Sequence, residues 1–272
     1  MRFEMAMRSA DDTGQMLIPI NFQYQMSNAI YRRIQRRDRG YARMLRDRGA
    51  VHGYKSFKLF TFSRLRADDI KPADINGRKM LAVGSEHVRM TVSMVSERLF
   101  DILLWGNHKD RTLRLGDARL ICNIYSMPEP RIGGALKLRT ISPIVLSRKI
   151  YRKSALTGKF KEVYMSPDDP DYLEYLKRNI EEKFTAWKSA LGEPVYSVEK
   201  RMRRTGTIRS FKPVSKPRPS LTILKEGRRA ETRVRGWSFD FEIEGHPEIL
   251  EFAYRAGFGK MNPTGFGCVE KI

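Results

Sequence analysis

Segments with strand-like and helix-like patterns follow one another in the same order twice along the chain, and this repeated order constrains the fold most. The first half carries a strand over residues 1–8, a helix over 20–34, strands over 57–63 and 87–93, a helix over 95–106 and a strand over 118–125. The first helix is predicted because Phe22, Met26, Ile30 and Ile34 recur at a spacing of four, which places them on one helical face. The resulting order, β-α-β-β-α-β, is that of a ferredoxin-like unit.

The second half repeats this order. It carries a strand over 136–141, a helix over 170–191, strands over 195–211 and 221–244, a helix over 248–256 and a strand over 265–272. The proline-rich segment 212–219 joins the two long strands, and we expect a basic hairpin there. Between the halves, the prolines and glycines of 128–134 are the strongest local breakers. The sequence therefore predicts an α+β fold of two tandem ferredoxin-like (RRM-like) domains, over 1–127 and 135–272, with a linker at 128–134.

The charge of the chain indicates a polyanionic partner. Its 52 Lys and Arg residues exceed its 31 Asp and Glu residues, which gives a formal net charge of +21. Charge of this size favours nucleic acid as the partner. No run of ~18 apolar residues is present, so no membrane partner is expected and a cytoplasmic location is predicted. Cys122 and Cys268 lack a neighbouring Cys or His at zinc-ligand spacing, so neither a metal nor a cofactor is expected.

The predicted hairpin is the main candidate for binding nucleic acid. Its cations alternate with apolar residues, so one face can contact phosphates while the other packs. These candidate residues are Lys200, Arg201, Arg203, Arg204, Arg209, Lys212, Lys216, Arg218, Lys225, Arg228, Arg229, Arg233 and Arg235. A solvated positive hairpin without a ligand is the alternative interpretation.

A glycine-rich segment lies close to the end of the sequence. Two Gly-Phe-Gly triplets flank a short polar stretch, and glycine permits positive φ and exposes amide donors, as in loops that bind phosphate. The candidate residues are Gly257, Phe258, Gly259, Lys260, Gly265, Phe266 and Gly267. The segment lacks the Gly-Lys-Ser/Thr of a Walker loop, and it follows a helix rather than a strand, which excludes a Rossmann turn. The two phenylalanines can stack on unpaired bases or serve as packing anchors.

Four motifs in order carry a resemblance to a known family. They are Ile30-Tyr31-Arg32, the segment 58–63 (Lys-Leu-Phe-Thr-Phe-Ser), the segment 140–144 (Thr-Ile-Ser-Pro-Ile) and the paired Gly-Phe-Gly triplets. With these motifs the chain resembles, over its full length, the CRISPR-associated repeat-processing endoribonucleases of the repeat-associated mysterious protein superfamily. The resemblance implies metal-independent cleavage of precursor CRISPR RNA within each repeat. It also implies cyclic-phosphate and 5′-hydroxyl ends, and a product that guides an interference complex.

The resemblance also implies the catalytic residues. The tyrosine and the lysine of the family correspond to Tyr31 and Lys58, whereas Arg46 stands where the family usually has a histidine. We hypothesise that His52, in a loop longer than the family's, takes the place of that histidine as acid or base. Tyr31 would orient the 2′-hydroxyl, and Lys58 with Arg46 would neutralise the phosphorane.

Two other functions remain open from the sequence. The departure at Arg46 makes a non-catalytic CRISPR repeat-RNA-binding protein the main alternative. A structural backbone subunit of an interference complex is a third interpretation, because such subunits share the superfamily fold. The endoribonuclease is expected to work on repeat RNA as a monomer or weak homodimer.

Overall fold

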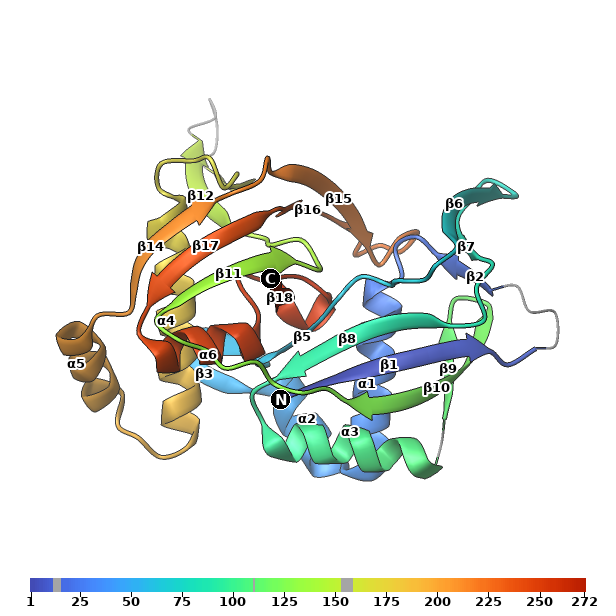
Figure 1. The fold of residues 1–272 in the computed structure, drawn as a ribbon, viewed down its shortest axis with the longest axis horizontal. Helices are drawn as coiled ribbons and strands as arrows, with labels where there is room; N and C mark the ends of the chain where they lie inside the picture. The colour runs from blue at the N-terminus through green and yellow to red at the C-terminus, as the bar shows by residue number, and fades with distance from the viewer. Residues whose placement is uncertain (12–15, 110, 153–158) are drawn as a thin grey trace.

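Two units, each built around one main sheet and its helices, lie side by side in the computed structural model, which describes residues 1–11, 16–109, 111–152 and 159–272 (Figure 1). The elements of the N-terminal unit are β1 (Arg2–Ser9), β2 (Met16–Pro19), α1 (Gln23–Arg37), α2 (Arg39–Asp47), β3 (Ala50–His52), β4 (Lys55–Phe57), β5 (Phe60–Phe62), β6 (Ile70–Ile75), β7 (Arg78–Val83), β8 (Val88–Met94), α3 (Glu97–Lys109), β9 (Thr112–Leu115) and β10 (Ala118–Ser126).

The N-terminal sheet has the strand order β5-β8-β1-β10-β9, and all of its pairs are antiparallel. Phe3, Met5 and Met7 alternate along β1 and are buried on the face covered by the helices, against residues such as Ile30 and Leu99. Without β9, the order of the strands and the two helices α1 and α3 is that of a ferredoxin-like unit. This part of the sequence prediction is confirmed.

Insertions in this unit were not predicted. Helix α2 and the β3–β4 hairpin lie between α1 and β5, and the hairpin β6–β7 pairs with β2 in a small separate sheet. The expected strand over 57–63 is shorter than predicted. Leu59 has a φ of 53°, which interrupts the extended backbone, so Lys58 lies between β4 and β5 rather than on a strand.

The C-terminal unit repeats the architecture. Its elements are β11 (Ala135–Thr140), β12 (Ser147–Arg152), β13 (Lys159–Tyr164), α4 (Tyr172–Ala190), α5 (Val195–Thr205), β14 (Ile208–Pro213), β15 (Arg218–Leu224), β16 (Thr232–Ser238), β17 (Asp240–Gly245), α6 (Pro247–Ala256), the 3-10 turn η1 (Asn262–Thr264) and β18 (Val269–Lys271). Its main sheet has the order β14-β17-β11-β18, and α4 and α6 pack on that sheet through one apolar cluster. The prediction of a second ferredoxin-like unit is therefore confirmed as well.

The predicted basic hairpin is wrong in its first strand and in its turn. Residues 195–205 form α5, which begins after Pro194 and ends before Gly206, and which buries Val198 and Met202 at helical spacing. Strand β14 pairs with β17, and the same two chain segments continue outward as β15 paired with β16. The turn therefore lies at 225–231, and 212–219 runs along one side of the hairpin.

The outer part of this hairpin, β15–β16 with its turn, reaches from the C-terminal unit to the start of α1 (Figure 1). We call it the arm. The side chain of Asn21 accepts a hydrogen bond from the Ile223 amide at 3.0 Å and donates one to Glu226 at 2.9 Å. The arm therefore joins the two units directly beside α1.

The segment between the units has no regular structure. Residues 127–134, all of them described, form neither helix nor strand and connect β10 to β11. This agrees with the breakers in the sequence, while the division of the chain into domains at 128–134 stays a prediction.

Candidate functional site

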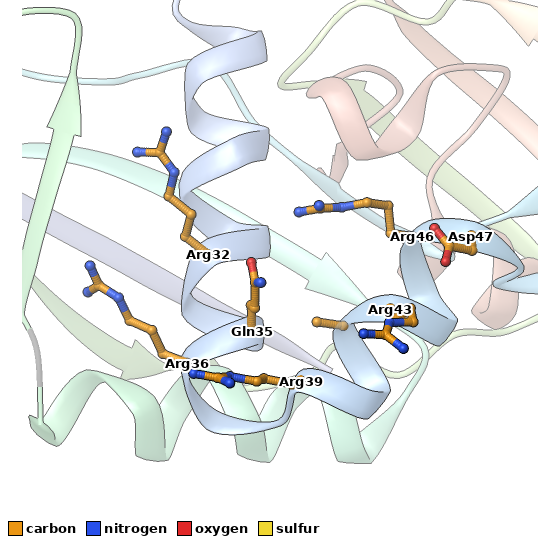
Figure 2. A pocket seen from close by; sticks show the side chains of 8 residues that line it. Arg32, Gln35, Arg36, Arg39, Arg43, Arg46 and Asp47 are labelled. Atoms are coloured by element: carbon orange, nitrogen blue, oxygen red, sulfur yellow. The ribbon is translucent and has the colours of Figure 1, made fainter.

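A strongly charged cavity lies in the angle between α1 and α2 and has a volume of about 710 Å³. It is lined by Arg32, Gln35, Arg36, Arg39, Ala42, Arg43, Arg46 and Asp47. Figure 2 shows Arg46 extending from α2 toward α1. Five of the eight lining residues are arginines, whose planar guanidinium groups bind phosphate oxygens in pairs. The cavity is therefore suited to a phosphate-bearing ligand.

The break between α1 and α2 produces this cavity. Asp38 leaves the helical conformation with φ −147° and ψ 96°, and its carboxylate accepts a hydrogen bond from the Tyr41 amide at 2.8 Å, which caps the start of α2. Arg98 holds the same carboxylate at 2.6 Å. Helix α2 buries Tyr41 and Leu45, so the arginines on its other face are turned toward open space.

Tyr31 lies beside this cavity, on the same turn of α1 as Arg32. Its side chain is only 9% exposed, and its ring meets the Phe60 ring edge to face at 5.8 Å. The guanidinium carbon of Arg46 lies 5.4 Å from the centre of the Tyr31 ring, within the range of a cation–π contact. Burial raises the pKa of Tyr31 to about 12, although Arg46 opposes the shift. The phenol therefore stays protonated near neutral pH.

Lys58 lies next to the end of α2. Its Nζ donates to the Ser56 hydroxyl at 2.9 Å, and a Cβ added to Gly49 would lie 3.0 Å from its Cδ. Burial lowers the pKa of Lys58, and the nearby carboxylate of Asp47 partly opposes this shift. Because Asp47 also lines the arginine cavity, Lys58 and Arg46 belong to one charged region.

His52 lies elsewhere. It ends β3, which packs against α4, and it lines a different cavity of about 630 Å³ between the units. The structure thus brings Tyr31 and Arg46 together, places Lys58 near Asp47 at the end of the same helix as Arg46, and puts His52 in the lining of a different cavity.

The glycine-rich segment does not present its amides to a ligand as expected. The amides of Phe258, Lys260 and Gly267 donate to the carbonyl oxygens of Gly267, Val145 and Pro143, respectively. Phe258 and Phe266 are 0% and 1% exposed, so in this structure neither can stack on a base. The interpretation of the two phenylalanines as packing anchors is the one that the structure supports.

Buried side chains hold this segment from inside. Asn262 Nδ2 donates to the carbonyl oxygens of Phe258 and Phe266 at 3.0 and 2.9 Å. Lys183 of α4 is fully buried, and its Nζ donates to the carbonyl oxygens of Gly257 and Gly259 at 2.8 and 2.5 Å. Burial lowers the pKa of Lys183 to about 7. The segment is therefore fixed by internal hydrogen bonds.

Lys260 is likewise engaged within the protein. Its Nζ donates to the carbonyl oxygen and the hydroxyl of Ser147 at 3.0 and 2.6 Å. It also lies 3.5 Å from Glu162. In this structure Lys260 therefore contributes to packing at the start of β12.

The cations predicted for RNA binding are spread over α5, β14, the loop after β14 and the arm. Lys200, Arg201, Arg203 and Arg204 are on α5; Arg209 and Lys212 are on β14; Lys216 is in the following loop; Arg218, Lys225, Arg228, Arg229, Arg233 and Arg235 belong to the arm. Helix α5 lies at the end of the C-terminal unit away from α1 (Figure 1). At the arm turn, Lys225 and Arg228 lie 5.6 and 5.7 Å from the centre of the Tyr24 ring on α1. The arm turn is therefore the part of this set that reaches the helix carrying Tyr31.

Most of the arginine cavity was not predicted from the sequence. Arg32, Arg36, Arg39 and Arg43 were not assigned to binding, although Arg32 and Arg36 share one helical face. Asp38 followed by Tyr41 was the available signal for the start of a second helix. With that helix recognised, the spacing of Arg39, Arg43 and Arg46 places all three on one face.

Within the described ranges, no group of three or more His, Cys, Asp or Glu side chains is arranged to hold a metal ion. Among the same residues, none of the helices has both the length and the apolar character needed to cross a membrane.

Two family models together match nearly the whole chain. Residues 17–124 match the model described as CRISPR-associated protein Cas6, N-terminal, and residues 127–271 match the model described as CRISPR associated protein Cas6, C-terminal. The chain is also similar to two curated proteins. It is 27% identical to the CRISPR-associated endoribonuclease Cas6 1 of Methanocaldococcus jannaschii, over 100% of this chain and 93% of that protein. It is 25% identical to the CRISPR-associated endoribonuclease Cas6 of Pyrococcus furiosus, over 99% and 89%.

Solved structures share the fold. One, described as a characterization of a Cas6-related gene from Pyrococcus furiosus, superposes with a TM-score of 0.76 at 22% identity, over 100% of this chain and 98% of that one. Another, described as an RAMP protein binding different RNA substrates, has a TM-score of 0.76 at 20% identity, over 100% and 99%. At these identities the similarity supports the two-unit ferredoxin-like fold.

Proposed function

Because the chain belongs to the CRISPR-associated Cas6 family of endoribonucleases in CRISPR RNA processing, we propose that it cuts precursor CRISPR RNA within each repeat without a metal ion. The reaction is attack of a 2′-hydroxyl on the adjacent phosphorus. It leaves a 2′,3′-cyclic phosphate on one fragment and a 5′-hydroxyl on the other. DNA lacks the nucleophile and is not cut.

One observation carries the proposal: Arg46 lies against the ring of Tyr31 at the edge of a cavity lined by five arginines, with Lys58 beside the end of the same helix. A protonated phenol, a guanidinium and an amine of lowered pKa thus occur together. These groups can orient a hydroxyl, stabilise a dianionic phosphorane and move a proton, which are the tasks that this reaction requires.

We assign one task to each of the three side chains. Tyr31, kept protonated by burial, hydrogen-bonds the 2′-hydroxyl and holds it in line with the leaving oxygen. Arg46 binds the non-bridging oxygens, whose negative charge grows in the transition state. The Lys58 ammonium gives its proton to the 5′ oxygen as the P–O5′ bond breaks, and the 2′ proton passes to solvent. Lowering the pKa of Lys58 makes it a better acid near neutral pH.

His52 is the competing candidate for proton transfer. An imidazole is the commonest general acid or base in enzymes, but His52 lines the cavity beside α4 rather than the arginine cavity. If it acts as acid or base, His52→Ala abolishes the maximal cleavage rate and leaves RNA affinity unchanged. In our assignment the maximal rate survives this substitution.

A non-catalytic repeat-RNA-binding protein is the second candidate function, and Arg46 in the family's histidine position is the observation that favours it. For binding, we propose that the cations of the arm turn and the arginine cavity contact repeat RNA on either side of Tyr24. We further propose that the protein works as a monomer or weak homodimer and passes its product to an interference complex. Sedimentation with and without RNA tests the oligomeric state.

The deciding experiment incubates the protein in EDTA with end-labelled repeat RNA and with copies carrying one 2′-deoxy nucleotide each. A single cut that one deoxy substitution abolishes, with a cyclic phosphate on the upstream fragment, supports the proposal. Tight binding of RNA that stays intact, with and without added Mg²⁺, supports the binding-only alternative.

A further inference from the structure

The cavity that contains His52 is polar and lies between the two units. It has a volume of about 630 Å³, within the range of sites that hold small ligands. Strand β3 supplies His52, and α4 and α5 supply most of the remaining lining residues. The charged residues of the lining are three cations, Lys177, Arg178 and Arg203, and three carboxylates, Glu181, Glu182 and Glu199. Glu182 is paired with Lys55. The cavity is separate from the arginine cavity, and the proposed reaction does not use it.

Two buried threonines also line this cavity. Thr185 and Thr207 are 1% and 3% exposed, and the Thr207 hydroxyl donates a hydrogen bond to Glu181. That bond fixes the direction of the Glu181 carboxylate. The cavity therefore offers a carboxylate of fixed direction together with cations in the same lining.

The chain connects this cavity directly to the proposed reaction site. Helix α2 ends at Asp47, β3 runs from Ala50 to His52, and β4 returns to Lys58. Since β3 has three residues, it spans only about 10 Å. The hairpin is fixed in this position by Lys55, whose Nζ lies 2.5 and 2.7 Å from the two carboxylate oxygens of Glu182 on α4. RNA bound at Arg46 thus has this cavity within reach of a neighbouring nucleotide.

The side chains match the parts of a nucleotide. Lys177, Arg178 and Arg203 can contact a phosphate, and the half-buried imidazole of His52 can stack on a base. Glu181 and Glu199 can accept hydrogen bonds from a base amino group. Adenine, cytosine and guanine carry such a group, whereas uracil does not.

We propose that this cavity is a specificity subsite that holds one unpaired nucleotide of the repeat close to the cut, with its base on His52 and its amino group on a glutamate. The proposal rests on the RNA cleavage proposed above. The subsite should make cleavage prefer adenine, cytosine or guanine over uracil at one position of the repeat. His52 in this role binds substrate and takes no part in proton transfer.

An abasic scan combined with His52 variants tests the subsite. Each nucleotide near the cut is replaced by an abasic one, and single-turnover cleavage is measured as a function of protein concentration. In the wild type, one position raises the half-saturating concentration by about tenfold, the size expected for losing one stacked base. With His52→Ala, intact RNA shows the same loss, and the abasic substitution at that position adds nothing more. His52→Phe keeps the stacking surface. It should bring the half-saturating concentration for intact RNA, and the effect of the abasic substitution on it, back toward their wild-type values.

Matched controls separate this result from a folding effect. His87→Ala removes a histidine from the loop between β7 and β8, which does not line this cavity, and leaves the scan unchanged; melting temperatures are compared for every variant. Glu181→Gln reduces the preference against uracil at the sensitive position.

Three results overturn the proposal. The first is that His52→Ala and the abasic substitution raise the half-saturating concentration independently of each other at every position, and the second is that no abasic position raises it in the wild type. The third is that His52→Ala lowers the maximal rate and leaves the half-saturating concentration unchanged. If no RNA is cut at all, the proposed function fails, while the same scan read by equilibrium RNA binding still tests the subsite.

Discussion

The arginine cavity between α1 and α2 and the glycine-rich segment at 257–267 differ in the direction of their hydrogen-bonding groups. In the cavity, the side chains of five arginines line open space. In the glycine-rich segment, amides and carbonyls bond to other parts of the protein, and both phenylalanines are buried. The most conspicuous motif of this sequence therefore supports the fold, whereas the charged region that can act on a phosphate lies in a short inserted helix.

The two regions are nevertheless connected. Thr61 on β5 donates to the Phe266 carbonyl oxygen at 2.7 Å, and Phe60 on the same strand packs against Tyr31. The glycine-rich segment therefore fixes β5, and β5 supports the ring that carries the proposed reactive hydroxyl. Loss of the segment should damage activity through the fold, whereas loss of the arginines should damage activity alone.

The largest effect on stability is expected at Gly267. A Cβ there would overlap the Phe258 carbonyl oxygen, and φ is 75°. Gly267→Ala should lower the free energy of unfolding by about 4 kcal/mol, as strained and overpacked core substitutions do. Thermal and urea unfolding measure the loss. Gly227→Ala in the arm turn is the control, because φ is 70° but nothing lies within 4 Å of the added atom. An equal loss in both variants would contradict the role of the segment as a packed support.

Lys58 should affect rate rather than fold. Lys58→Met removes the proposed acid and should lower the single-turnover rate about 100-fold at neutral pH. In the wild type, the rate should rise with pH and then fall as Lys58 loses its proton at a pKa below its ordinary value. Lys58→Arg does not titrate in this range, so the alkaline fall should disappear. If the rate of Lys58→Arg still falls at alkaline pH, that fall arises from the titration of a group other than Lys58.

The arginine cavity should contribute to the salt dependence of binding. Replacing both Arg32 and Arg36 by Gln should reduce the slope of log affinity against log salt concentration by about 0.7 for each single-strand phosphate that the protein no longer neutralises. The matched control replaces Lys200 and Arg204 of α5, which line neither this cavity nor the one beside His52, and should change this slope less. Titrations of 2′-deoxy-blocked repeat RNA at several salt concentrations provide the measurement.

The smallest effect is a dependence of stability on pH. The pKa of Lys183 is about 7 in the folded state and about 10.4 in an unfolded chain. Between these values the unfolded state binds more protons, so stability rises with pH, by at most about 1.4 kcal/mol per pH unit. Urea unfolding from pH 7 to 9 should show this rise in the wild type and lose it in Lys183→Met. Lys188→Met, which removes a lysine paired with Glu193 and Glu248, should keep the rise.

The apolar periodicity of the sequence was sufficient to predict two consecutive ferredoxin-like units. Their strands and helices bury regular apolar faces, such as Phe3, Met5 and Met7 of β1. The periodicity was insufficient for α5, where basic residues surround only two buried positions, Val198 and Met202, and resemble an alternating strand. Helix α2 was missed for a similar reason, because it is short, buries only Tyr41, Ala42 and Leu45, and carries three arginines among its exposed residues.

The candidate site could be predicted only in part. Tyr31, Arg46 and Lys58 were chosen by resemblance, and contacts across α1 and α2 bring the first two together. No sequence signal shows that β3 turns His52 toward α4, since that depends on the Lys55–Glu182 pair between the units. The internal use of the glycine-rich amides depends on partners such as Val145, more than 100 residues away.

The most direct test of the central claim is the single-turnover cleavage rate of Arg46→Ala on repeat RNA, measured with its RNA affinity and melting temperature. We expect a rate lower by about 100-fold or more, as for loss of a group that stabilises transition-state charge, with an unchanged melting temperature and only a modest loss of affinity. Arg46→Lys should recover little, because a lysine cannot reproduce the paired contacts of a guanidinium. A rate equal to wild type in Arg46→Ala would contradict the assignment of the reaction to the arginine cavity.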